Sequence, residues 1–175
     1  MTGPRARWGF HELDSRWAGR LVALAGVAPG EVVVDVGAGS GRITEALVAA
    51  GARVVAVELH PGRAAALRRQ FARDLVVVVR ADACDLRLPR RPFKVVANPP
   101  FASTTALLRR LTHRASRLER AVLVLPSWAT ARWSNGRGAG GAARDAFVFR
   151  AGPWVPTTAF HPPAPPAKVL VVERR

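Results

Sequence analysis

Short apolar runs rich in valine alternate with segments of helical periodicity along the chain. The expected strands are residues 31–34, 53–57, 75–79, 95–97, 121–125, 146–149 and 169–172. We expect helices at residues 43–50, ending at Gly51, and from His60 and Pro61 to Phe71. Strands that alternate with helices indicate an α/β fold with parallel strands, and we expect the last two strands to pair.

A glycine-rich loop follows the first expected strand. Residues 35–41 read DVGAGSG, so Gly37, Gly39 and Gly41 alternate behind Asp35. A strand, a tight glycine turn and a helix N-terminus allow backbone amides to approach a ligand closely. The spacing differs from the Gly-x-Gly-x-x-Gly of dinucleotide sites, which disfavours a nicotinamide-dependent oxidoreductase. The loop therefore predicts a ligand site of another kind.

Acidic residues end the next two expected strands. Glu58 lies about 20 residues beyond the glycine loop, where a carboxylate can accept hydrogen bonds from ribose hydroxyls. Asp82 lies just past the third strand and can bind the amine of an adenine ring, with Asp85 as the competing candidate. Together with the glycine loop, these acids favour a cofactor that contains adenosine.

The sequence NPPF at residues 98–101 follows the fourth expected strand. Ligands bind at the carboxyl ends of strands in open α/β sheets. The amine of adenine is a poor nucleophile, because its lone pair is delocalised into the ring. The Asn98 amide oxygen and the Pro99 carbonyl can accept its two hydrogens, and Phe101 can stack on the base. A Pro-Pro turn would explain the tetrapeptide alone, but its position behind the glycine loop favours a catalytic pocket.

The composition agrees with one catalytic domain over residues 1–175. Hydrophobic residues make up 49%, which argues against a disordered chain, and no apolar run approaches the roughly 20 residues that span a bilayer. Cys84 is the only cysteine, and the four histidines show no metal-ligand spacing. We expect a cytoplasmic protein without a metal site, without a membrane partner and monomeric.

The formal net charge of +15 is the most unusual bulk property. Lys94 and Lys168 are the only lysines among the 27 basic residues, so arginine dominates. GC-rich coding explains the choice of arginine better than it explains the excess over acids. Polyanion binding is favoured, with strong salt dependence. The candidate contacts lie on a segment after the fourth strand and in a glycine-rich segment: Arg109, Arg110, Arg132 and Arg137.

Together these motifs resemble the ribosomal RNA adenine-N6 methyltransferases, a family that includes the erythromycin-resistance enzymes and the small-subunit dimethyladenosine transferases. Phe160-His161-Pro162-Pro163 is similar to the closing signature of that family, and the resemblance extends from about Trp8 onward. It implies a Rossmann-like class I methyltransferase fold, a seven-stranded and mostly parallel sheet whose last strand is antiparallel. It also implies S-adenosyl-L-methionine as cofactor and structured ribosomal RNA as partner.

By the same resemblance, Asn98, Pro99 and Phe101 are catalytic. The implied cofactor residues are His11, Gly37, Gly39, Gly41, Glu58, Asp82, Ala83 and Asn98. The short length favours the resistance type, which implies an adenosine of large-subunit (23S) RNA as target and resistance to macrolides, lincosamides and streptogramin B.

Three features depart from the family pattern. Gly9-Phe10-His11 stands where a Gln-Asn pair is usual, so His11 either replaces the asparagine or only leads into a helix. Residues 164–168 distort the proline-rich closing motif. The chain stops at Arg175, so we expect the usual C-terminal helical domain to be absent.

Other interpretations stay open. The same pocket motif serves adenine methyltransferases that act on small-subunit RNA or DNA, and a non-catalytic RNA-binding or ribosome-assembly protein is a further alternative. Residues 126–152 are hard to interpret, because residues 134–141 disfavour regular structure. Trp128 and Trp133 suit either an RNA-contacting loop or rings packed beneath a surface loop.

Overall fold

The computed structural model describes residues 11–175 and contains a seven-stranded sheet of order β4-β3-β2-β5-β6-β9-β7. Its strands are β2 (Val32–Val36), β3 (Arg53–Val57), β4 (Val76–Val79), β5 (Phe93–Ala97), β6 (Leu118–Pro126), β7 (Phe147–Val155) and β9 (Ala167–Arg174). Strands β2 to β6 pair in parallel, whereas β9 is antiparallel to both β6 and β7. The expected mostly parallel sheet with an antiparallel last strand is confirmed.

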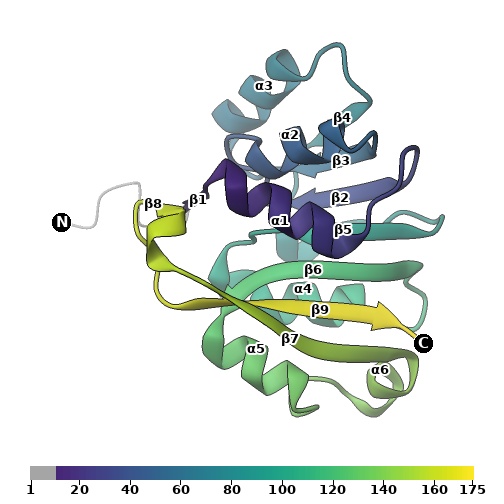
Figure 1. Ribbon diagram of the computed structural model, residues 1–175. Coiled ribbons are helices and arrows are strands. Elements are labelled where there is room, and N and C mark those ends of the chain that lie inside the picture. Colours follow the sequence, from purple (N-terminus) through teal and green to yellow (C-terminus); the bar gives the residue numbers. More distant parts are fainter. Residues whose placement is uncertain (1–10) are drawn as a thin grey trace.

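Helices cover both faces of this sheet (Figure 1). On one face lie α1 (Ser15–Ala25), α2 (Arg42–Ala49) and α3 (Pro61–Gln70), and on the other lie α4 (Thr104–Leu111), α5 (Ser127–Ser134) and α6 (Gly141–Ala146). Each face forms its own apolar core, because the strand side chains alternate between the two layers. None of the helices within residues 11–175 is both long enough and apolar enough to cross a bilayer.

Three short 3-10 turns and two short strands complete residues 11–175. The turns are η2 (Ala83–Asp85), η3 (Phe101–Ser103) and η4 (Thr157–Ala159), and the strands β1 (Glu12–Leu13) and β8 (Phe160–His161) form a two-stranded ribbon. The ribbon joins the start of the described chain to the segment before β9, and the Asp14 amide donates to the Ala159 carbonyl over 2.9 Å. Residues far apart in sequence therefore close over the same end of the sheet.

Helix α1 was not among the elements expected from the sequence. Its signals are nevertheless present: the Asp14 side chain accepts from the Trp17 amide over 2.7 Å, and Gly26 ends the helix with a φ of 58°. Trp17 and Leu21 lie on its buried face. The helices that were expected each follow an apolar strand in the sequence. No such strand precedes α1, so this signal was lacking.

Residues 126–152, which were hard to interpret from the sequence, contain more regular structure than expected. Helix α5 covers its first part, and α6 its last part before β7. Trp133 is only 1% exposed and packs in the core, whereas Trp128 is 61% exposed. The packed interpretation is therefore confirmed for Trp133, and Trp128 stays at the surface.

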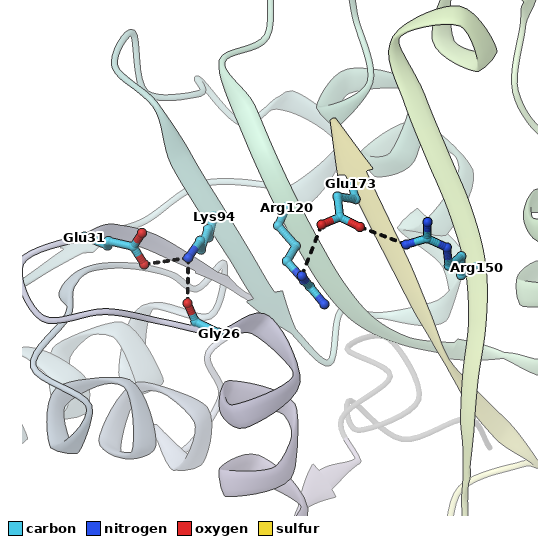
Figure 2. A network of polar contacts seen from close by, with 6 residues as sticks. All are labelled: Gly26, Glu31, Lys94, Arg120, Arg150 and Glu173. Atoms are coloured by element: carbon cyan, nitrogen blue, oxygen red, sulfur yellow. Dashed lines mark hydrogen bonds and ion pairs between the residues drawn. The ribbon is translucent and has the colours of Figure 1, made fainter. Parts of the chain in front are cut away.

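Ion pairs tie the strands together at the edge where β5 and β6 begin. Figure 2 shows Lys94, which donates to the Gly26 carbonyl and the Glu31 carboxylate, both over 2.7 Å. Nearby, Glu173 of β9 lies between Arg120 and Arg150, at 3.2 and 2.9 Å. Pairs of this exposure each contribute little to stability. They do show that Lys94 and Arg120, two of the basic residues behind the high net charge, are paired with acids of the protein itself.

Candidate active site

A cavity of about 430 Å³ opens at the carboxyl ends of β2, β3 and β5. Its lining brings together nearly all the residues that the sequence predicted for the cofactor and the reacting amine: His11, Gly37, Gly39, Glu58, Asp82, Ala83, Asn98, Pro99 and Phe101. The volume lies within the usual range for small-molecule sites. The topology explains the convergence, because neighbouring parallel strands end at the same edge.

The glycine loop requires glycine at each alternate position. Gly37, Gly39 and Gly41 have φ angles of 78°, 58° and 92°, a region that side chains with a Cβ rarely adopt. At Gly37 a Cβ would lie 3.1 Å from the ring of Pro100. The Gly37 amide donates to the Val57 carbonyl over 2.8 Å, which draws the loop against β3. Gly41 lies behind the cavity wall, where a Cβ would meet a phenyl carbon at 2.9 Å.

Glu58 is held firmly at the end of β3. It is 4% exposed, and its Oε2 accepts from the Gly39 amide over 2.9 Å. Its Oε1 accepts from the His60 amide over 2.7 Å and from Arg63 over 3.0 Å. A carboxylate offers about four acceptor positions, so the fixed group retains capacity for a ribose hydroxyl. Glu58 thus positions the glycine loop as well as lining the cavity.

The structure distinguishes the two acids after β4. Asp82 lines the cavity, and its Oδ1 accepts from the Cys84 amide over 2.8 Å at the start of η2. Asp85 lies outside the cavity and faces the Arg110 guanidinium at 3.2 Å. This placement agrees with the preference for Asp82 over Asp85.

Asn98 has a fixed orientation. Its Nδ2 donates to the His11 carbonyl over 2.8 Å, while its Oδ1 accepts no hydrogen bond from residues 11–175. The Pro99 carbonyl likewise accepts none within that range, because the turn that follows uses the Pro100 carbonyl, which accepts from the Ser103 amide and hydroxyl at 3.0 and 2.7 Å. Two acceptors on one rigid turn, both on residues that line the cavity, therefore have no hydrogen-bond partner among residues 11–175.

The β1–β8 ribbon brings His11 to the cavity. Glu12 accepts from the Ser40 hydroxyl and from Arg42, the latter over 3.0 Å, which ties the ribbon to the glycine loop. The Ser40 hydrogen bond holds the pKa of Glu12 below its ordinary value. Gly9 and Phe10 belong to the segment that stands in place of the family's Gln-Asn pair, and they lie outside the described residues. Trp8, where the resemblance begins, also lies outside them.

Asp35 is a site residue that the sequence analysis did not assign a role. It is fully buried on the cavity wall, where its Oδ2 accepts from the Thr44 hydroxyl over 2.7 Å and its Oδ1 has no hydrogen-bond partner among residues 11–175. Burial raises the pKa of this carboxyl to about 7, the Thr44 hydrogen bonds offsetting only part of the effect. The sequence feature that could have identified Asp35 as a site residue is its position directly before the glycine loop.

The four candidate arginines have different environments. Arg109 lines a groove beside α4 together with Arg87, Arg90 and Arg117, a lining that includes no carboxylate. Arg110 also lines it, but its guanidinium donates to the Leu86 carbonyl and to Asp85 and so braces η2 against α4. The other two candidates, Arg132 and Arg137, are exposed and have no partner within residues 11–175.

A protein-family model described as ribosomal RNA adenine dimethylase matches residues 7–167. Similar curated proteins include the mycinamicin-resistance protein MyrB of Micromonospora griseorubida, at 36% identity over 95% of this chain and 56% of the relative. An rRNA adenine N-6-methyltransferase of Corynebacterium diphtheriae is 33% identical over 81% and 57%. A ribosomal RNA small subunit methyltransferase A of Leifsonia xyli is 37% identical over 72% and 48%. The chain spans about half the length of these relatives.

The fold has similar solved structures. The crystal structure of the 23S rRNA methyltransferase ErmE matches with a TM-score of 0.83 and 24% identity, over 95% of this chain and 70% of that one. A dimethyladenosine transferase from Plasmodium falciparum matches with a TM-score of 0.79 and 16% identity, over 94% and 64%. At these identities the likeness establishes a shared fold.

Proposed function

Because the chain belongs to the ribosomal RNA adenine dimethylase family, we propose that it methylates N6 of an adenosine in ribosomal RNA. The observation that carries the proposal is the fixed turn at residues 98–100. Asn98 is anchored through its Nδ2, so its Oδ1 and the Pro99 carbonyl are the open acceptors. These two acceptors suit the two hydrogens of a primary aromatic amine and would help localise its lone pair.

The residues of the cavity fit S-adenosyl-L-methionine, which supplies an electrophilic methyl group when bound. Glu58 would accept from the ribose hydroxyls, Asp82 from the adenine amine, and the glycine loop would approach the methionine part of the cofactor. Asp35 lines the same cavity, so its ionised form can pair with a cationic group of the cofactor. This arrangement would hold donor and acceptor in line, and proximity would supply much of the rate.

The target adenosine has to leave its base stack, which costs a few kcal/mol. Phe101 is half-buried at the cavity and would recover part of this cost by stacking on the base. No side chain has to act as a nucleophile. The proton on the product amine is acidic enough to pass to solvent.

We infer further that the target lies in large-subunit RNA. The similarity to MyrB, which is named a resistance protein, and to a 23S rRNA methyltransferase fold supports this choice. Methylation at the drug-binding tunnel would then give resistance to macrolides, lincosamides and streptogramin B. Similarity to small-subunit methyltransferases makes a small-subunit adenosine the second candidate. Arg109, Arg132 and Arg137 are exposed and have no acidic partner within residues 11–175, so they would contact phosphates. A monomeric single domain remains our expectation.

The test is transfer of a labelled methyl group from S-adenosyl-L-methionine to rRNA extracted from an unmodified bacterium, followed by mapping of the labelled base. Label on N6 of a 23S adenosine is the expected result. Label on small-subunit RNA or DNA would retain the chemistry and overturn the target. Asn98→Ala should lose transfer while cofactor affinity stays within about twofold, and near-normal turnover of this variant would refute the role of Asn98.

A further inference from the structure

Two aromatic rings, and no others among residues 11–175, line the candidate active-site cavity: the phenyl of Phe101 and the imidazole of His11. Their centroids are 6.5 Å apart, and their planes are inclined by 26°. Two rings with one planar base between them would be roughly 6.8 Å apart, twice the rise of about 3.4 Å per base in stacked nucleic acid. The pair therefore has nearly the spacing of a slot for one flat heterocycle.

One hydrogen bond holds the imidazole of His11 and a second holds its backbone. Its Nδ1 donates to the Pro162 carbonyl over 3.0 Å, and its own backbone carbonyl accepts from Asn98 Nδ2. The β1–β8 ribbon fixes the backbone immediately after it. The residue that orients the acceptor amide thus also places a ring beside it, at little further cost in conformational entropy.

The phenyl ring of the closing segment is not available for the same task. Phe160 is 1% exposed and packs in the core beneath the ribbon, away from the cavity lining. His161 lies next to it on β8 but does not line the cavity either. His11 is therefore the described ring that faces Phe101 at the site.

We propose that His11 and Phe101 are the two walls of the pocket for the target base, with the imidazole stacking on the face that Phe101 leaves uncovered. This inference rests on the proposed function and assigns a residue of the chain to the substrate adenosine. It differs from the cofactor role that the sequence analysis gives to His11. Stacking between two rings would stabilise the extruded base and hold its amine at Asn98.

The experiment compares wild type with His11→Ala, His11→Phe and the control His161→Ala, all as the full chain. Initial rates against 23S rRNA concentration at saturating S-adenosyl-L-methionine give kcat/KM, and titration calorimetry without RNA gives cofactor affinity. We expect His11→Ala to lower kcat/KM about tenfold or more, which is the loss that removal of one stacking ring causes. His11→Phe, which keeps a ring but loses the Nδ1 donor, should stay within about threefold of wild type, as should the control. Cofactor affinity should be unchanged in all three.

A second readout does not depend on methyl transfer. Free 2-aminopurine riboside loses fluorescence when it stacks, so its quenching by cofactor-loaded protein should be present in wild type and His11→Phe and reduced in His11→Ala. Equal loss of rate in His11→Phe and His11→Ala would overturn the proposal in favour of a polar role. Weaker cofactor binding by His11→Ala would overturn it in favour of the cofactor role. A wild type that quenches but methylates no rRNA would refute the proposed function and leave the two-ring pocket supported.

Discussion

Replacing Asp35 with asparagine should make the protein more stable at pH 8 and remove one source of its pH dependence. The carboxyl is fully buried, and burial raises its pKa from 3.8 to about 7. An acid with a raised folded-state pKa contributes stability that is present below pH 3.8 and is lost as the pH rises through about 7. Ionisation of Asp35 therefore lowers the free energy of unfolding.

The size of the effect follows from the two pKa values. Their difference corresponds to about 4 kcal/mol lost by the wild type between acid and alkaline pH. Asparagine does not ionise and still accepts from the Thr44 hydroxyl, but its amide nitrogen would take the place of the unpartnered Oδ1. An unsatisfied amide costs about 1–3 kcal/mol. We expect a net gain of about 1–3 kcal/mol at pH 8 and a net loss of about 0.5–2.5 kcal/mol near pH 4, where the wild-type carboxyl is largely neutral in the folded protein.

Urea unfolding of both proteins without cofactor, from pH 4 to pH 8, measures this difference directly. The comparison cancels the carboxylates whose pKa is lowered, such as Glu12 and Glu31, because both proteins contain them. Parallel stability curves for the two proteins would refute the buried, raised-pKa state of Asp35. The same variant should bind S-adenosyl-L-methionine more weakly despite its greater stability, since the wild-type carboxylate lines the cavity.

Three further predictions concern substitutions at the glycine loop, in the core and after β4. Gly37→Ala should reduce cofactor affinity at least tenfold by calorimetry, because φ is 78° and a prolyl ring lies 3.1 Å from the added Cβ; wild-type affinity would contradict the close approach. Trp133→Ala should cost about 3–5 kcal/mol of unfolding free energy, whereas Trp128→Ala, at a 61% exposed position, should cost less than about 0.5; comparable losses in denaturant unfolding would count against the packing described here. Asp82→Ala should weaken binding of S-adenosyl-L-methionine while Asp85→Ala does not, and the reverse order by calorimetry would exchange their assignments.

The strands and the glycine turn near the site could be predicted from the sequence alone. The alternation of valine runs and helical segments predicted strands such as β3 over the same residues, 53–57, that form it in the structure. The spacing of glycines predicted a tight turn, and all three have positive φ. These predictions succeed because strand period, turn conformation and strand-end chemistry are local properties of a few consecutive residues.

Only the tertiary structure decided how distant segments meet. The sequence favoured Asp82 over Asp85 without showing which of them lines the cavity, and it gave no reason for the His11 carbonyl to anchor Asn98, which is 87 residues away. It also could not show that Arg110 is held by Asp85 while Arg109 has no acidic partner within residues 11–175, or that Asp35 is buried enough for its pKa to reach about 7. The composition and order of residues fix the chemical groups, whereas burial, facing direction and partners depend on the packing of strands and ribbons brought together from opposite ends of the chain.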